Sequence, residues 1–324
     1  MAVSKALRDA PDISVGTKAR VKAEAQKRNY IPNRAAQNLR SRRSGLIGVV
    51  VPQINHTYYS QLVWGVERQA EAVGLQMVLA HSLDRADNEM REVLKLIARQ
   101  VDVLILVPAV RWQHRLATLE LVRTSRIPAV LLDAYPAGAE NFPLVSWVVC
   151  DDKRAGQLAT EHLLELGHRD ILFLAGPNGS SSSAGRFSGY QRSLKTAEVA
   201  YSDNLVYLAD KDIASGRKAM AQALSEKAEF TAVVAFNDSV AIGAIDTLQQ
   251  QGFRVPEDVS VVGFGDGVLA ENFRVPLTTV RIPQVAMGET ALRLALDLQK
   301  GVPVEPRHLP VEIIVRESTA KLAT

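Results

Sequence analysis

The sequence of 324 residues contains a single cysteine, Cys150, and no long uninterrupted run of apolar residues. One cysteine excludes an internal disulfide and a metal site built from several cysteines. No apolar segment approaches the ~18 residues that a membrane-spanning helix needs. The first residues also lack the apolar segment of a secretory signal. These absences predict a soluble protein, for which the cytoplasm is the default location.

Motifs of the common enzyme classes are missing as well. The serine run Ser180–Ser183 stands without the Gly-x-Ser-x-Gly turn that exposes a hydrolase nucleophile. Neither a phosphate-binding loop nor a dinucleotide-binding glycine pattern occurs. His162 and His168 could suggest a metal pair, but their spacing places them on different helical faces. We therefore expect a protein that is not an enzyme and that uses no cofactor or metal.

Charge is distributed unevenly along the chain. Residues 1–45 carry 11 Lys/Arg and 3 Asp/Glu, a net charge of +8. The other 279 residues carry 27 Lys/Arg and 32 Asp/Glu, a net charge of −5. A small basic segment on a mildly acidic body indicates a polyanion as the partner of that segment alone. We call residues 1–44 the head and residues 45–324 the core.

The head has the pattern of two short helices followed by a break. Val3, Ala6 and Leu7 lie on one apolar face of the first helix. Ser14 is placed to cap a second helix that extends to Arg28, with Val15, Ala19 and residues 21–25 facing inward. Serine at such a position can equally well be a plain helix cap or a phosphate contact, and the two roles are compatible.

Residues 30–44 form the stretch that connects the head to the core. Pro32 suits the first turn of a short helix, and Leu39 is an apolar residue beside several arginines. One or two helical turns are not stable alone in water, so this segment should fold only against an anionic groove. A lone leucine among basic residues can act as a wedge in a DNA minor groove. An ordinary basic linker is the alternative interpretation.

The core alternates apolar strand patterns with amphipathic helix patterns. The expected strands are 46–52, 75–80, 103–107, 129–132, 170–174, 205–208, 232–235 and 259–262. The expected helices are 59–73, 88–99, 116–124, 155–167, 186–199, 214–226 and 240–251. This alternation predicts the α/β class, with doubly wound parallel sheets.

So many strand–helix units exceed a single sheet, and we therefore expect two similar subdomains. The first should comprise about residues 45–152 and 282–306, and the second about residues 153–281 and 307–320. Ligands of such sheets bind beyond the carboxyl ends of the strands, which here means the cleft between the subdomains.

Several short motifs in this order resemble the LacI/GalR family of bacterial repressors. In the head these are residues 3–7, Tyr30-x-Pro32-Asn33 and Leu39, and in the core 48–52, 102–108, 162–169, 176–177, 185–190, 235–238, 262–266 and 275–281. The resemblance covers nearly the whole chain and implies a helix-turn-helix head, a hinge helix and a periplasmic-binding-protein-like core.

The resemblance implies DNA contacts in the head. The positions that correspond to base, phosphate and hinge contacts are Ser4, Lys5, Ser14, Tyr30, Asn33 and Leu39. Family heads begin with a further helix, whereas this chain begins inside the recognition helix. We expect either that Met1 is an internal methionine chosen as the start or that the product is naturally truncated and binds DNA poorly.

The resemblance also implies a set of effector contacts in the cleft. They are Tyr58, Tyr59, Asp133, Arg186, Asn237 and Asp266. Aromatic rings, an arginine and amide or carboxylate groups suit a polyhydroxylated ligand. Core packing is the alternative for the tyrosines, and because they are adjacent we expect only Tyr59 to face the core side of the cleft. A loop cap is the alternative for Asp133.

Gly265 stands where the family commonly has an acidic residue that contacts sugar hydroxyls. Its lack of a carboxylate, together with Arg186, suggests a sugar acid or sugar phosphate as effector, whereas Asp266 could restore a site for a neutral sugar.

The function that we expect is a homodimeric repressor of a carbohydrate-utilisation operon, which binds operator DNA under control of this effector. The alternative is a stand-alone sugar-binding receptor without effective DNA binding, because its head is truncated.

Overall fold

The computed structural model describes residues 2–7, 9–30, 43–109, 115–136 and 138–322. The chain divides into two compact units, Met1–Ser44 and Gly45–Thr324. These units are the head and the core, and each is described by itself. The stretch that should contain the hinge helix, with Asn33 and Leu39, lies outside the described residues.

In the head, helix α1 (Ala2–Leu7) packs on helix α2 (Val15–Lys27) and buries Ala6 completely. Val3, which was predicted on the same apolar face, is 57% exposed. Ser14 caps α2 as predicted, because its Oγ accepts the N–H of Thr17 at 3.3 Å. The prediction that Val15, Ala19 and residues 21–25 face inward is wrong for Val15, Ala19 and residues 22–24, which are exposed, whereas Val21 and Ala25 are half-buried. Val15 is 82% exposed and no residue of α2 is buried, since a helix of six residues can cover little of α2.

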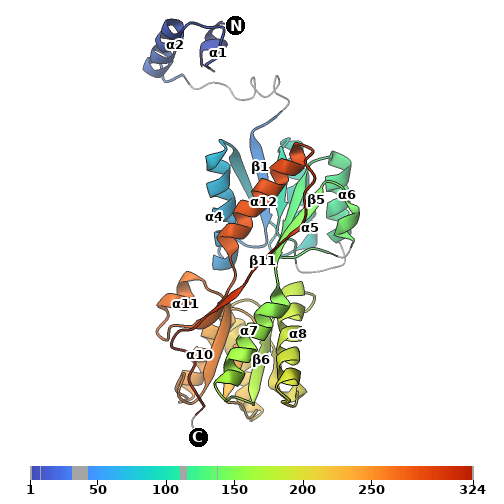
Figure 1. Ribbon diagram of the computed structural model, residues 1–324, viewed down its shortest axis with the longest axis vertical. Helices are drawn as coiled ribbons and strands as arrows, with labels where there is room; N and C mark the ends of the chain where they lie inside the picture. The colour runs from blue at the N-terminus through green and yellow to red at the C-terminus, as the bar shows by residue number, and fades with distance from the viewer. Residues whose placement is uncertain (1, 8, 31–42, 110–114, 137, 323–324) are drawn as a thin grey trace. The chain divides into compact units, whose positions relative to one another are not determined.

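The core alternates strands and helices along the chain (Figure 1). Its strands are β1 (Leu46–Val51), β2 (Gln76–His81), β3 (Val103–Leu106), β4 (Ala129–Leu132), β5 (Val145–Cys150), β6 (Ile171–Ala175), β7 (Val206–Leu208), β8 (Ala232–Ala235), β9 (Ser260–Gly265), β10 (Thr278–Arg281), β11 (Arg307–Leu309) and β12 (Glu312–Ile314). Its helices are α4 (Thr57–Ala72), α5 (Ala86–Ala98), α6 (Arg115–Ser125), α7 (Asp152–Glu165), α8 (Ser181–Thr196), α9 (Ile213–Ser225), α10 (Asp238–Gln250), α11 (Val268–Asn272) and α12 (Gln284–Gln299), with short 3-10 turns η2 (Ala139–Asn141) and η3 (Asp203–Leu205).

The strands form two six-stranded sheets, which confirms the predicted α/β class with two subdomains. The first sheet has the order β11-β5-β4-β3-β1-β2 and is parallel throughout. The second has the order β12-β10-β9-β8-β6-β7, in which only β12 runs antiparallel to its neighbour. The orders correspond strand for strand, so the two subdomains share one architecture.

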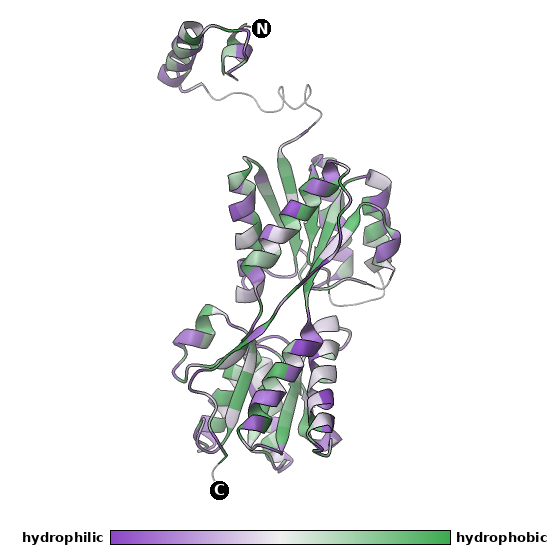
Figure 2. Ribbon diagram, viewed as in Figure 1, coloured by the Kyte–Doolittle hydropathy of each residue, from purple (hydrophilic) through white to green (hydrophobic). Residues whose placement is uncertain are grey.

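Helices cover both faces of each sheet, which explains why the strands are almost entirely apolar. In the first subdomain, α4 and α12 cover one face and α5 and α6 the other. In the second, α9 and α10 cover one face and α7 and α8 the other. Figure 2 shows hydrophobic strands in both subdomains, flanked by helices with one hydrophilic side.

Three connections join the subdomains: one after β5, one between β10 and α12, and one between β11 and β12. The predicted assignment of residues 307–320 to the second subdomain is wrong at its start, because β11 pairs with β5 in the first sheet. The chain crosses instead at residues 310–311, and Val311 packs against the cores of both subdomains. The strand and helix patterns also missed β5, β10, β11, β12, α11 and α12.

Helices α7 and α8 approach each other closely enough to exclude side chains at their crossing. A Cβ on Gly156 would lie 2.1 Å from the carbonyl oxygen of Arg186, and one on Gly189 would lie 2.2 Å from that of Lys153. Glycine is therefore required at this crossing. Helix α8 begins at Ser181 with Ser180 as its N-cap, five residues earlier than predicted. Arg186 consequently lies within the second turn of α8 and does not open it.

Candidate effector-binding cleft

A pocket lies between the two subdomains, beyond the carboxyl ends of β1, β4, β6, β7, β8 and β9. It is lined by His56, Thr57, Tyr58, Tyr59, Gln61, Asp133, Ser180, Ser182, Arg186, Lys211, Phe236, Asn237, Asp238, Ser239, Phe264, Gly265, Gly267, Ile282 and Gln284. Five of the six predicted effector contacts are in this set, and Asp266 is not. The sequence patterns gave no indication of Ser180, Ser182 or Asp238 as pocket residues.

Arg186 is buried in the pocket wall and held from several directions. Its Nε donates to Asp152 Oδ1 at 2.9 Å, and its Nη1 donates to the carbonyl oxygen of Phe236 at 2.7 Å. The guanidinium carbon lies 5.0 Å from the ring centre of Phe236 and 4.9 Å from that of Phe264. Two hydrogen bonds and two aromatic rings therefore fix the plane of the guanidinium group.

Tyr58 and Tyr59 both line the pocket. Tyr59, which was expected on the core side of the cleft, is buried in the core of the first subdomain, and Tyr58 is half-buried. They occupy the first turn of α4, where adjacent residues diverge by about 100° and can still reach one concave surface. The Tyr58 hydroxyl donates to Asp133 Oδ1, and the rings of the two tyrosines meet edge to face. Burial raises the pKa of both hydroxyls, so they remain protonated donors.

Asn237 caps α10 and also spans two loops of the second subdomain. Its Oδ1 accepts the N–H of Val240 at 2.8 Å, and its Nδ2 donates to the Lys211 carbonyl at 2.9 Å. Strand-to-helix junctions of this kind place polar groups at the ligand side of a parallel sheet. Asn237 thus has a structural role that is compatible with the predicted contact to a ligand.

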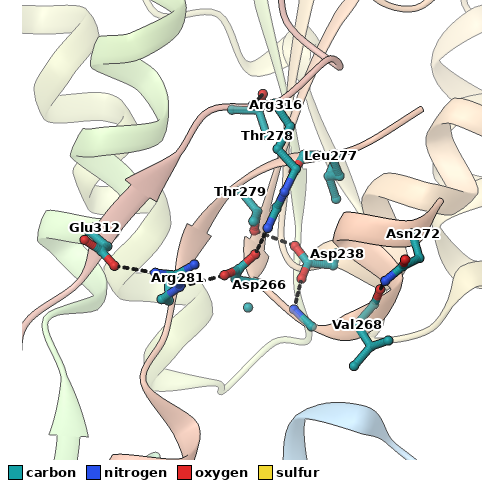
Figure 3. A network of polar contacts seen from close by, with 12 residues as sticks. Asp238, Asp266, Val268, Asn272, Leu277, Thr278, Thr279, Arg281, Glu312 and Arg316 are labelled. Carbon is teal, nitrogen blue, oxygen red and sulfur yellow. Dashed lines mark hydrogen bonds and ion pairs between the residues drawn. The ribbon is translucent and has the colours of Figure 1, made fainter. Parts of the chain in front are cut away.

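Asp238 supplies a carboxylate to the part of the pocket where Gly265 suggested that one was missing. It accepts the Thr279 hydroxyl at 2.6 Å and the N–H of Gly267 at 3.0 Å (Figure 3). Burial raises the pKa of Asp238 to about 6. Gly265 has φ +135°, and a Cβ there would lie 2.9 Å from Asp238 Oδ2. The premise that the pocket lacks this carboxylate is therefore wrong.

Asp266 points away from the pocket, contrary to the prediction that it contacts the effector. Its carboxylate binds Arg281 Nε at 2.6 Å and Arg316 Nη2 at 2.5 Å (Figure 3). Arg281 also pairs with Glu312 on β12 at 2.7 Å. The left-handed backbone of Asp266, with φ 56°, turns its side chain toward the two chain crossings beside β10 and β12. Asp266 therefore links the turn after β9 to the chain segments that connect the two subdomains.

Lys211 links the two walls across the pocket. Its Nζ binds Asp84 Oδ2 at 2.7 Å and lies 3.5 Å from the Tyr59 hydroxyl, both in the first subdomain. The Lys211 carbonyl accepts from His56 Nε2 at 3.4 Å, while His56 Nδ1 accepts the N–H of Tyr58. Burial lowers the pKa of His56, which favours the neutral ring that this arrangement needs.

The head residues that were expected to contact DNA lie partly within the described chain. Lys5 is paired with Asp12, Ser14 is the cap of α2, and the side chain of Tyr30 is exposed. The side chain of Ser4 falls outside the described part of the head, as do Asn33 and Leu39.

The two histidines considered as a metal pair have other partners. His162 Nε2 lies 3.0 Å from Thr319 Oγ1. His168 is buried between the hydroxyls of Thr231 and Ser260. Within the described ranges, no group of three or more His, Cys, Asp or Glu is placed to hold a metal ion. Every helix in the described part of the chain is too short or too polar to cross a lipid bilayer.

The sequence is similar to those of known proteins with a related architecture. Residues 160–319 match a family model described as a periplasmic binding protein-like domain. The HTH-type transcriptional regulator DegA of Bacillus subtilis (strain 168) is 30% identical over 326 residues, which cover 99% of this chain and 95% of DegA. The regulator CelR of Thermobifida fusca is 33% identical over 330 residues, which cover 98% of this chain and 93% of CelR. The chain belongs to the LacI family of transcriptional regulators.

Solved structures extend this similarity to three dimensions. The lac repressor dimer bound to operator and the anti-inducer ONPF is 29% identical with a TM-score of 0.87, and the match covers 98% of this chain and 94% of the repressor chain. The CelR–cellobiose complex is 30% identical with a TM-score of 0.77, covering 97% of this chain and 94% of that chain. The predicted family and the predicted fold class are both confirmed.

Proposed function

We propose that this LacI-family chain is a repressor of a carbohydrate-utilisation operon, and that a small molecule in the cleft controls its affinity for operator DNA. The main support is that similarity to transcriptional regulators spans 99% of the chain, head and core together. The regulator acts as a homodimer on a near-palindromic operator, in the cytoplasm and without catalysing a reaction.

The head supplies the attraction to DNA through its net charge of +8. Lys5 is suited to donate to guanine acceptors, and its exposed pair with Asp12 costs little to exchange for DNA. The hydroxyls of Ser4, Ser14 and Tyr30 and the amide of Asn33 are suited to phosphate contacts. Leu39 is the candidate wedge in the minor groove.

The charges of the cleft favour a neutral polyhydroxylated effector over a sugar acid or sugar phosphate. Both cationic side chains of the wall already have carboxylate partners, Arg186 in Asp152 and Lys211 in Asp84. The wall carboxylates Asp133 and Asp238 are held by uncharged donors. These carboxylates retain acceptor capacity for ligand hydroxyls and would repel a second anion.

Operator selection followed by ligand competition tests this function. The full chain should enrich a near-palindromic sequence from random duplexes, and footprinting should map that sequence beside genes for sugar transport or breakdown. A panel of neutral mono- and disaccharides should contain a member that changes operator affinity, whereas the corresponding aldonic acids should be inactive. A chain that binds such a sugar but selects no DNA sequence would favour the receptor-like alternative.

A further inference from the structure

Arg186 is a buried cation in the pocket wall with one carboxylate partner, Asp152. Its guanidinium lies between the rings of Phe236 and Phe264, and its side chain is only 6% exposed. The Nε–H and one Nη1–H are taken by Asp152 and the Phe236 carbonyl. The Nη2 edge has no hydrogen-bond partner among the described residues. A cation that is buried in this way interacts strongly with any nearby negative charge.

Asp152 is the carboxylate that compensates this cation, although it is not among the residues that line the pocket. It is the first residue of α7, and its side chain is 15% exposed. The close crossing of α7 and α8 brings it to Arg186, because a Cβ on Gly185 would lie 2.7 Å from the Asp152 Cβ. The helix packing therefore prescribes the pairing of these two residues.

The pair makes the arginine side of the pocket neutral overall. Burial raises the pKa of Asp152 to about 6 even beside Arg186, so the carboxylate is ionised at neutral pH. An anionic ligand that reached the Nη2 edge would meet a guanidinium that is already compensated, and would also face Asp133 and Asp238. A ligand hydroxyl pays no such electrostatic penalty and can still accept a hydrogen bond from that edge.

We propose that Asp152 is a specificity-determining residue that acts through Arg186: it compensates the guanidinium and so makes the cleft select neutral polyols over anionic ones. This inference rests on the proposed effector role of the cleft, but it does not depend on DNA binding. Asp152 lies outside the pocket lining and works by setting the charge and the orientation of the arginine.

The substitution Asp152→Asn tests this selectivity, because the amide oxygen can still accept from Arg186 Nε while the negative charge is removed. Binding to the full chain is measured by calorimetry and thermal shift with two probes of one carbon skeleton, glucitol and gluconate. Inorganic phosphate against chloride at matched ionic strength provides a simpler anionic probe. We expect the ratio of gluconate to glucitol affinity to rise about tenfold in the variant, and phosphate binding to appear.

Asp151→Asn is the matched control. Asp151 precedes Asp152, is exposed and caps α7 through the N–H of Arg154 at 2.8 Å, a role that asparagine also fills. This control removes the same charge without touching the pair and should leave both probes unchanged. The double variant Asp152→Asn with Arg186→Ala should lose the gained anion binding. Asp152→Ser replaces Asp152→Asn if circular dichroism shows that the asparagine variant is unfolded.

Three results would overturn the proposal. One is the absence of any gain in gluconate or phosphate binding in a folded Asp152 variant. Another is an equal gain in Asp151→Asn, which would mean that distant charge and not the pair sets selectivity. The third is a gain that persists without the Arg186 guanidinium. None of these binding assays contains DNA. Their results can therefore be interpreted even if the chain selects no operator sequence.

Discussion

The two walls of the cleft hold their polar side chains in different ways. On the second-subdomain wall, Arg186 and Asp238 are fixed by partners within that subdomain. On the first-subdomain wall, His56 and Tyr59 contact Lys211 of the opposite subdomain. The second wall is therefore arranged before the cleft closes, whereas part of the first is arranged by closure itself. Such a difference suits a protein in which ligand binding and subdomain movement are coupled.

Disrupting the second-subdomain wall should have the largest effect on effector affinity. Arg186→Ala removes the buried donor and leaves Asp152 without its cationic partner, so effector affinity should fall about 100-fold or more. Calorimetry with the sugar identified by operator competition measures this loss. Arg192→Ala is the control, because Arg192 lies on the same helix with its side chain exposed. Wild-type affinity in Arg186→Ala would mean that the second wall is not the main binding surface.

Removing the Lys211 contacts between the two walls should have an intermediate effect on effector affinity. Lys211→Met removes the contacts to Asp84 and Tyr59 but keeps the carbonyl that accepts from His56. We expect a more open ligand-free core, seen as a larger radius of gyration by small-angle scattering, and an effector affinity reduced about tenfold. Lys218→Met on the exposed side of α9 controls for the charge. An unchanged radius and unchanged affinity would contradict a role for Lys211 in closure.

The last expected effect is on the stability of the fold and depends on pH. Burial raises the pKa of Asp238 from 3.8 to about 6, so the folded state disfavours the ionised form. The stability that this group contributes is complete below its unfolded-state pKa and is lost as the pH rises through about 6. Relative to Asp238→Asn, the wild type should therefore lose about 2 kcal/mol of unfolding free energy as the pH rises from about 4 to about 7.

Urea denaturation of both proteins across this pH range measures that difference. The comparison between the two proteins matters because Asp152 also has a raised pKa of about 6 and titrates in the same window. Its contribution is present in both proteins and cancels from the difference. Parallel stability profiles for the wild type and Asp238→Asn would show that the Asp238 carboxylate is not strained by burial.

Sequence patterns were most informative where structure depends on local apolar periodicity. The strands at 129–132 and 232–235 were predicted with the bounds that the structure has, because short runs of consecutive apolar residues are typical of buried strands in this alternation. Helix starts were less well predicted, as α8 shows. Its serine run, Ser180–Ser183, has the composition of a loop but caps and opens the helix.

The pocket was predictable as a location but less so as a set of contacts. The family resemblance implied Tyr58, Tyr59, Asp133, Arg186 and Asn237. All five line the pocket, and each follows the carboxyl end of a strand or lies near a strand-to-helix junction. Asp266 could not be judged in this way, because its partners Arg281 and Arg316 are distant in sequence.

By itself, the sequence determined the class of the fold, the split between a basic head and an acidic core, and membership of a family of DNA-binding regulators. Hydrophobic periodicity and net charge are sums over neighbouring residues, so both can be calculated from the sequence without knowledge of the fold. Only the tertiary structure decided which carboxylate pairs with which cation and which carboxylates face the cleft. Asp152 compensates Arg186, Asp238 occupies the space beside Gly265, and Asp266 turns away from the cleft. These pairings depend on backbone direction at single residues and on helix crossings, and neither leaves a local pattern in the sequence.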